Sequence, residues 1–136
     1  MKKITMLAGA LSMAASVVLP AAAEAATPPV ARNGICEAGE FCLYYYSGLR
    51  GSVSDFNTQI PGYGDSQPTC YEFKTPGLDG YQRCVWHNAM SAWNRTSHTV
   101  RVRIIINYRG GYDEIGAGDS ANLSTASNAN ESHQYV

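Results

Sequence analysis

Apolar and polar residues alternate most clearly along residues 99–107. Four β-branched residues recur at every second position and so share one side of an extended chain: Val100, Val102, Ile104 and Ile106. Arg101 and Arg103 fall on the other side. This period of two predicts a strand with one buried face.

A second strand is predicted at residues 41–46, where Leu43 and Tyr45 lie opposite Tyr44 and Tyr46. Shorter apolar segments bounded by Gly, Pro, Asn, Asp or Ser are further strand candidates: residues 71–73, 85–86, 112–115 and 121–123. No stretch has the apolar spacing of an amphipathic helix. We therefore expect an all-β protein.

Residues 44–51 are partly repeated at residues 103–110. In each copy a bulky residue at the sixth position, Leu49 or Tyr108, precedes a glycine at the eighth, Gly51 or Gly110. Each copy ends an extended run, so the glycine predicts a folded-over hairpin turn in which φ is positive. Two copies in one short chain predict a duplicated β domain.

The first 25 residues have the pattern of a secretory signal peptide. A basic start precedes an apolar run at residues 4–19, and residues 23–25 match the A-x-A cleavage pattern. The run is shorter than the about 20 residues of a membrane span, and Pro20 interrupts it. We expect cleavage after residue 25, a flexible leader at residues 26–34 and one domain at residues 35–136, secreted and extracellular.

The charge of the mature chain gives no support for a nucleic-acid or membrane partner. Removal of Lys2, Lys3 and Glu24 with the signal peptide leaves eight Lys and Arg residues against ten Asp and Glu residues, a formal charge of −2. The basic residues are also scattered along the chain. We expect neither nucleic acid nor a membrane as partner, and we expect a monomer.

All four cysteines lie in the part predicted to be exported: Cys36, Cys42, Cys70 and Cys84. An even count in a small secreted chain is typical of two disulfides. Three pairings are possible, and we favour Cys36–Cys42 with Cys70–Cys84, because each closes a short local loop. A zinc site is the weaker interpretation, since the spacings are wide and no C-x-x-C is present.

Two polar loops follow the hairpins, at residues 86–93 and 127–133. With the hairpin pattern, an aromatic, four residues, a bulky residue, one residue and a glycine, they resemble the βγ-crystallin superfamily. More narrowly, the signal peptide and residues 36–44, 88–96 and 100–111 resemble the secreted bacterial peptidase-inhibitor family built on that fold, which is named after the streptomycete metalloproteinase inhibitor. The resemblance implies a disulfide-stabilised sandwich of two Greek-key motifs that inhibits an extracellular peptidase, a metallopeptidase.

The calcium-loop signature of the superfamily is matched only in part. Four side chains match it and are the candidate metal ligands: Asn88, Ser91, Asn128 and Ser132. Calcium prefers about six to eight oxygen ligands, several of them carboxylates. Asn and Ser also close turns onto the backbone without any metal. We expect no cofactor beyond weak calcium binding, if any.

Neither H-E-x-x-H nor G-x-S-x-G occurs, so we expect no enzymatic activity. Trp86, Trp93 and the tyrosines fit either a carbohydrate platform or the filling of a small β core. Two functions are therefore compared. The first is a secreted peptidase inhibitor, and the second is a non-inhibitory extracellular module directed at wall polymer, glycan or a competitor cell.

An inhibitory segment has to be exposed, fixed in conformation and equipped with an apolar anchor. The region of Cys70 and Cys84 is our candidate, because it interrupts the first half and has no counterpart in the second. The candidate residues are Leu78, Tyr81, Cys84 and Val85. The alternative interpretation is that this region only covers a sheet edge, with Val85 and Trp86 in the core.

Overall fold

The structure is a computed structural model that describes residues 15, 16 and 32–136. Its strands are β1 (Phe41–Tyr46), β2 (Arg50–Phe56), β3 (Ser91–Asn94), β4 (Val100–Ile105), β5 (Arg109–Ile115), β6 (Ser120–Asn122) and β7 (Ser132–Tyr135). No helix is found among the described residues, which confirms the all-β prediction. That part of the chain also has no helix that could cross a membrane. Apart from residues 15 and 16, the predicted signal peptide lies outside the described residues.

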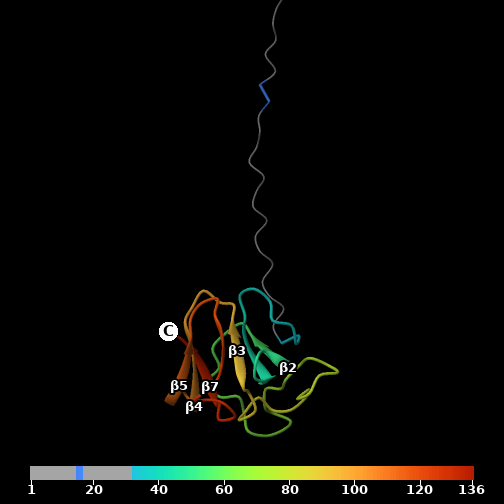
Figure 1. The fold of residues 1–136 in the computed structure, drawn as a ribbon, viewed down its shortest axis with the longest axis vertical. Coiled ribbons are helices and arrows are strands. Elements are labelled where there is room, and N and C mark those ends of the chain that lie inside the picture. Colours follow the sequence, from blue (N-terminus) through green and yellow to red (C-terminus); the bar gives the residue numbers. More distant parts are fainter. Residues whose placement is uncertain (1–14, 17–31) are drawn as a thin grey trace, which may run out of the picture.

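The strands form two antiparallel sheets that pack as a sandwich (Figure 1). One sheet has the order β2-β1-β3-β6, and the other has the order β5-β4-β7. Each half of the chain extends the sheet of the other half. Strand β6 of the second half pairs with β3, and Ile60 of the first half forms a bridge with His133 in β7. This exchange makes two interlocked Greek keys, as predicted.

The two predicted hairpin turns are built alike. Pairing of β1 with β2 shifts register just after Tyr44, and pairing of β4 with β5 shifts just after Arg103. The φ angle is 80° at Gly51 and 78° at Gly110, which confirms the prediction for both glycines. Positive φ also occurs at the turn residues themselves: Gly48, Leu49, Asn107 and Tyr108. Two consecutive residues of this kind are typical of the type I′ hairpin turn.

Gly110→Val should destabilise the fold by about 2–4 kcal/mol, from backbone strain and overpacking together. A Cβ atom at residue 110 would lie 2.9 Å from the Cγ1 atoms of Ile104 and Ile105. Chemical denaturation followed by circular dichroism measures the loss. Gly118 also has a positive φ but has no atom within 4 Å of its Cβ position, so Gly118→Val is the control for strain alone. Equal losses in the two variants would show that the isoleucine contacts are irrelevant.

The sandwich core is aromatic around one buried histidine. The ring of His133 lies 4.7 Å from that of Phe41 and 4.9 Å from that of Phe56. Tyr63 Oη donates to His133 Nδ1 at 2.8 Å, and His133 Nε2 donates to the Thr58 carbonyl at 2.8 Å. The carbonyl can only accept, so Nε2 carries a proton. Burial lowers the pKa of His133 to about 3, so the imidazole is neutral at pH 7 and its Nδ1 is an acceptor.

Two of the short predicted strands are wrong. Residues 71–73 contribute only a single bridge, between Glu72 and Cys84, and residues 85–86 form a turn. The backbone N–H groups of Tyr71, Phe73 and Val85 donate to carbonyls within the same irregular connection rather than to a strand ladder. The predicted strand at residues 99–107 ends at Ile105, so Ile106 lies in the turn and is exposed.

The predicted flexible leader extends too far into the domain. Arg32 donates to Ser54 Oγ, the Asp55 carbonyl and the Glu72 carbonyl at 2.6–2.8 Å. The backbone N–H groups of Asn33 and Gly34 donate to the Asp55 carboxylate. Residues 32–34 therefore belong to the folded domain, because they satisfy polar groups along the edge of β2. The rest of the predicted leader, residues 26–31, lies outside the described residues.

Candidate functional site

The connection between β2 and β3, residues 57–90, is an insertion that contains the region singled out from the sequence (Figure 1). The bond Cys70–Cys84 closes it, and Cys36–Cys42 closes the loop before β1, so the structure forms the favoured pairing. Inside the insertion, Phe73 N donates to the Arg83 carbonyl and Gln82 N donates to the Phe73 carbonyl. Residues 74–83, which we call the β2 loop, are thereby closed at their base.

The β2 loop covers the outer edge of β2. Lys74 N donates to the Val53 carbonyl at 2.7 Å, and Ser52 N donates to the Asp79 carbonyl at 2.9 Å. Thr75 and Ser52 add two bonds in opposite directions, from Thr75 N to Ser52 Oγ and from Ser52 Oγ to the Thr75 carbonyl. The predicted alternative, a covered sheet edge, is therefore part of the structure. The loop bonds to the strand near its start, at Lys74 and Thr75, and again in its middle, at Asp79.

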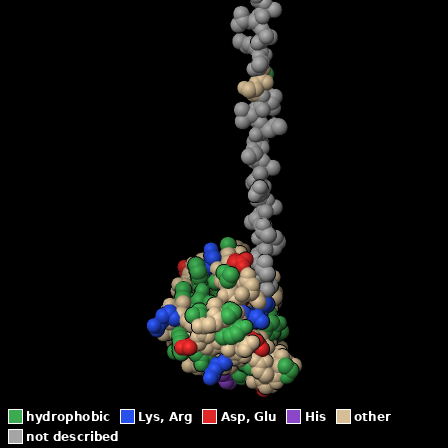
Figure 2. All heavy atoms as spheres, turned by 90° about the vertical axis from the view of Figure 1, so that its right-hand side faces the viewer, with side chains coloured by type: hydrophobic (Ala, Val, Ile, Leu, Met, Phe, Trp, Pro, Cys, Tyr) green, Lys and Arg blue, Asp and Glu red, His purple; other side chains and the backbone are tan. Residues whose placement is uncertain are grey.

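The middle of the β2 loop projects into solvent. Leu78 is 48% exposed and Tyr81 is 40% exposed. A Cβ atom at Gly77 would meet no atom within 4 Å. Figure 2 views the molecule from the side on which the insertion lies, where apolar side chains are spread between isolated basic ones. Leu78 and Tyr81 thus have the exposure that a binding anchor requires.

The exposed tip rests on the first hairpin. Gly80 has φ of 89° and lies so close to Tyr45 that a Cβ atom would fall 2.3 Å from its Cγ. Tyr46 Oη donates to Asp79 Oδ2 at 2.9 Å. The rings of Tyr45 and Tyr46 pack edge to face at 4.9 Å. The tip is therefore held by two tyrosines as well as by the backbone of β2.

The prediction of Val85 as an exposed anchor is wrong. Its exposed fraction is 0%, and it packs in the main core cluster. Val85 N donates to the Tyr71 carbonyl, which turns the side chain inward just after Cys84. Cys84 is half-buried in its disulfide, and Trp86 packs against the core. The Cys84-Val85 peptide bond therefore does not form part of the exposed tip.

The segment before β1 supports the base of the β2 loop. A Cβ atom at Gly34 would lie 2.6 Å from the Lys74 carbonyl carbon, and Thr75 Oγ1 donates to the Gly34 carbonyl. The Arg32 guanidinium stacks 4.4 Å above the ring of Phe56, and burial is the main cause that lowers its pKa. Local sequence patterns contain no signal for these contacts, since they join segments that are distant along the chain.

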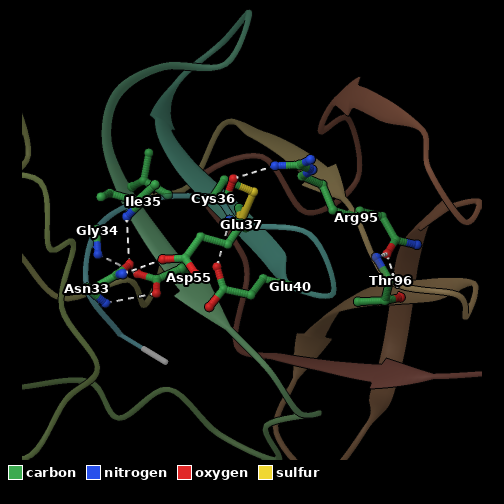
Figure 3. The surroundings of a disulfide bond; sticks show 12 residues. Asn33, Gly34, Ile35, Cys36, Glu37, Glu40, Asp55, Arg95 and Thr96 are labelled. Atoms are coloured by element: carbon green, nitrogen blue, oxygen red, sulfur yellow. Dashed lines mark hydrogen bonds between the residues drawn. A yellow bond between two sulfur atoms is a disulfide. The ribbon is translucent and has the colours of Figure 1, made fainter. Parts of the chain in front are cut away.

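Around Cys36–Cys42, acidic side chains accept backbone N–H groups (Figure 3). The Asp55 carboxylate accepts hydrogen bonds from the backbone N–H groups of Asn33 and Gly34. Glu37 N donates to Glu40 Oε2 at 2.8 Å. Glu40 is fully buried and its Oε1 has no partner among the described residues, and burial is the main cause that raises the pKa of this carboxyl. The disulfide region is thus a folded support for the N-terminal segment.

Two of the four predicted calcium ligands, both serines, bond to backbone carbonyls through their hydroxyls. Ser91 Oγ donates to the Tyr46 carbonyl and Ser132 Oγ donates to the Ile105 carbonyl, so each serine ties one hairpin to its own half. Asn88 Nδ2 donates to the Cys84 carbonyl, and Asn128 has φ of 53° in an exposed turn. No group of three or more His, Cys, Asp or Glu side chains suited to a metal occurs among the described residues.

Calorimetric titration of metal-free protein should show calcium binding no tighter than about the hundred-micromolar range, at the weak end known for protein sites. The reason is that the two loops hold a single carboxylate, Glu131, which already bonds to His87, and that both serine hydroxyls are engaged with backbone carbonyls. Ser91→Ala should destabilise the first hairpin without changing the heat of titration. A low-micromolar affinity that Ser91→Ala abolishes would contradict this prediction.

Comparison with known proteins agrees with this architecture. Residues 30–115 match peptidase inhibitor family I36, a range that contains the whole β2 loop. The chain belongs to this family. A peptidase inhibitor is not itself an enzyme, as expected from the missing catalytic motifs. No curated protein matches the chain.

A solved structure described as "Evolution of the eye lens beta-gamma-crystallin domain fold" is similar to this inhibitor-family chain in fold. The two share 10% sequence identity with a TM-score of 0.53, over 82% of this chain and 93% of that chain. At this identity the likeness shows the fold alone. It confirms the βγ-crystallin-like sandwich predicted from the hairpin motif.

Proposed function

We propose that this family member inhibits an extracellular metallopeptidase by inserting the β2 loop into its active-site cleft. The observation that carries the proposal is an exposed apolar tip on a backbone fixed at both ends. Leu78 and Tyr81 are the exposed anchors. The resemblance of residues 36–44, 88–96 and 100–111 to the secreted inhibitors supports the metallopeptidase class, and family membership supports peptidase inhibition in general.

Rigidity favours inhibition over turnover as a substrate. A loop that already has its bound shape loses little conformational entropy when it binds. The β2 loop is fixed by Cys70–Cys84, by bonds to Ser52 and Val53, and by the contact of Gly80 with Tyr45. After a cut at the tip, these bonds would still hold the two new ends in place, so release of the cleaved product would be slow.

An extracellular site of action is part of the proposal. Both disulfides are of the kind that persists in oxidising compartments. The predicted signal peptide at residues 1–25 accounts for export. Intact-mass measurement of secreted material tests both points, because cleavage before Ala26 and loss of four hydrogens have distinct masses.

The direct test incubates the mature protein with peptidases of the serine, cysteine, aspartic and zinc classes and measures residual activity. We expect inhibition of a zinc peptidase. Inhibition confined to another class would contradict the metallopeptidase assignment but not the loop. Absence of inhibition throughout the panel would favour the non-inhibitory extracellular module.

Leu78→Asp and Tyr81→Asp should each weaken inhibition more than about tenfold, which corresponds to 1.4 kcal/mol. A charged side chain in place of an exposed apolar anchor loses its fit to an apolar pocket but leaves the fold intact. Ile106→Asp is the matched control, because Ile106 is also an exposed apolar residue at a turn but lies on the second hairpin. Inhibition constants checked against circular dichroism decide the matter. Equal constants for all three variants and the parent would remove the β2 loop as the contact.

A further inference from the structure

Asp79 combines exposure with a fixed position at the tip of the β2 loop. It follows the exposed Leu78 directly, and its side chain is itself exposed. Tyr46 Oη donates to Oδ2, while no hydrogen bond among the described residues reaches Oδ1. The two salt bridges found in the described part of the chain involve other residues. The carboxylate therefore presents one open oxygen to whatever binds the tip.

The position of this carboxylate is set from two directions. Its own carbonyl accepts Ser52 N at 2.9 Å, and the next residue, Gly80, lies against the ring of Tyr45. The hydrogen bond to Asp79 is the main cause that raises the pKa of Tyr46, so the phenol stays protonated and donates a hydrogen bond to the carboxylate. A carboxylate held in this way is oriented before any partner arrives.

An open carboxylate oxygen beside an apolar side chain matches the surroundings of a catalytic zinc ion. Such zinc sites have three protein ligands and a fourth position occupied by water. Carboxylate oxygen is an ordinary zinc ligand. Peptide bonds are bound there beside pockets that receive a substrate side chain, so one ligand and one adjacent apolar anchor would occupy the metal and a pocket together.

We propose that Asp79 Oδ1 takes the water position on the zinc ion of the target peptidase while Leu78 fills the neighbouring apolar pocket. This rests on the proposed inhibition of a metallopeptidase. Zinc loses a bound water and gains one carboxylate oxygen, and no covalent bond of either protein changes. Tyr46 is a positioning residue, since it holds the second oxygen of the same carboxylate and touches neither the metal nor the pocket.

An Asp-Gly pair at a turn also occurs for conformational reasons alone. The experiment must therefore separate metal ligation from loop shape. The probe is a cobalt-substituted zinc peptidase of the panel, whose visible absorption reports the ligands of the metal. The parent protein should change this spectrum at stoichiometric addition, and it should bind the metal-free peptidase at least about tenfold more weakly, a difference of 1.4 kcal/mol.

Three variants complete the test. Asp79→Asn keeps the size of the side chain and should weaken inhibition at least about tenfold and leave the cobalt spectrum unchanged. Tyr46→Phe should give a smaller loss, and the spectrum should still change at saturation. Asp65→Asn is the matched control, because Asp65 is an exposed carboxylate of the same insertion that bonds only to Ser66, and it should inhibit like the parent.

The outcomes are distinct. If the parent inhibits the zinc peptidase but leaves the cobalt spectrum unchanged and binds the metal-free enzyme equally well, the ligand assignment is overturned and the proposed function stands. Equal inhibition by folded Asp79→Asn has the same meaning. If the parent inhibits no zinc peptidase, the proposed function and the ligand assignment both fall. The measurements on the parent decide even where Asp79→Asn does not fold.

Discussion

Acidification from pH 7 to pH 3 should lower the free energy of unfolding by several kcal/mol, mainly through His133. Burial among Phe41, Phe56 and Tyr63 lowers the pKa of His133 from 6.5 to about 3. At a pH between these two pKa values, the unfolded chain binds a proton at His133 that the folded protein does not bind. The contribution of His133 is therefore complete above pH 6.5 and falls by about 1.4 kcal/mol per pH unit towards pH 3. The whole effect is on the order of 4–5 kcal/mol.

Denaturation by urea across pH 3–8 measures this profile. His133→Gln should flatten it between pH 6.5 and 3, since an amide can accept from Tyr63 and donate to Thr58 but cannot titrate. The variant should be less stable than the parent at pH 7. Glu40 opposes the trend, because its raised pKa makes protonation in acid favourable to folding. His98→Gln, at an exposed histidine, is the control. A profile for His133→Gln as steep as that of the parent would refute the assignment.

Gly80→Ala should displace the β2 loop and abolish most of its inhibitory activity. The new Cβ atom would lie 2.3 Å from Tyr45 Cγ, a distance that no packed side chain tolerates. The positive φ adds strain of about 1–2 kcal/mol for a residue with a Cβ atom. Together with overpacking of about 1–3 kcal/mol, the change should either destabilise the domain or lift the tip off the first hairpin. Loss of inhibition and a lower unfolding free energy are the two readouts.

Gly77→Ala is the control that isolates the contact with Tyr45. Gly77 lies in the same loop and has φ of 77°, close to the 89° of Gly80, but open space surrounds its Cβ position. Gly77→Ala should therefore lower the unfolding free energy only by the cost of the backbone strain, and the variant should keep inhibiting. If both variants inhibit equally well, the packing of the tip against Tyr45 has no part in function.

Part of this structure was predictable because some of its signals are local. Strand β1 has the predicted bounds, and β4 follows from the alternation of β-branched and basic residues. Gly51 and Gly110 were predictable since a turn that reverses two strands requires a positive φ at that place. These features depend on neighbours within a few residues. They also specify the duplicated architecture.

Strands β2, β3 and β7 were missed because they bury polar side chains. Ser52, Ser54 and Asp55 in β2 are fully buried, and so are Ser91 and Asn94 in β3. An analysis of hydrophobic periodicity predicts that such polar residues face the solvent. Their burial is possible only because distant segments satisfy them, as Arg32 does for Ser54. Local patterning contains no trace of those partners.

The candidate site was predictable to the level of a segment. Leu78 and Tyr81 are exposed as an anchor requires, because turn residues on both sides place them at the tip. Val85 was wrong, since a short apolar pair after a cysteine can face either way, and here it completes the core. Tyr46 and Asp79 are 33 residues apart and meet only through the folding of the insertion onto the hairpin.

The exchange of strands between the two halves has a consequence for how the domain unfolds. Neither repeat can be removed as a unit, because β6 completes the sheet of the first repeat and Ile60 joins β7 of the second. A fragment that stops at residue 115, where the family match ends, lacks β6 and β7 altogether. Contacts of such long sequence separation form late and slow the search for the native state. Because each half of the chain pairs with the sheet of the other half, the domain should unfold in one cooperative transition. Its two repeats are alike, but neither should fold as an independent module.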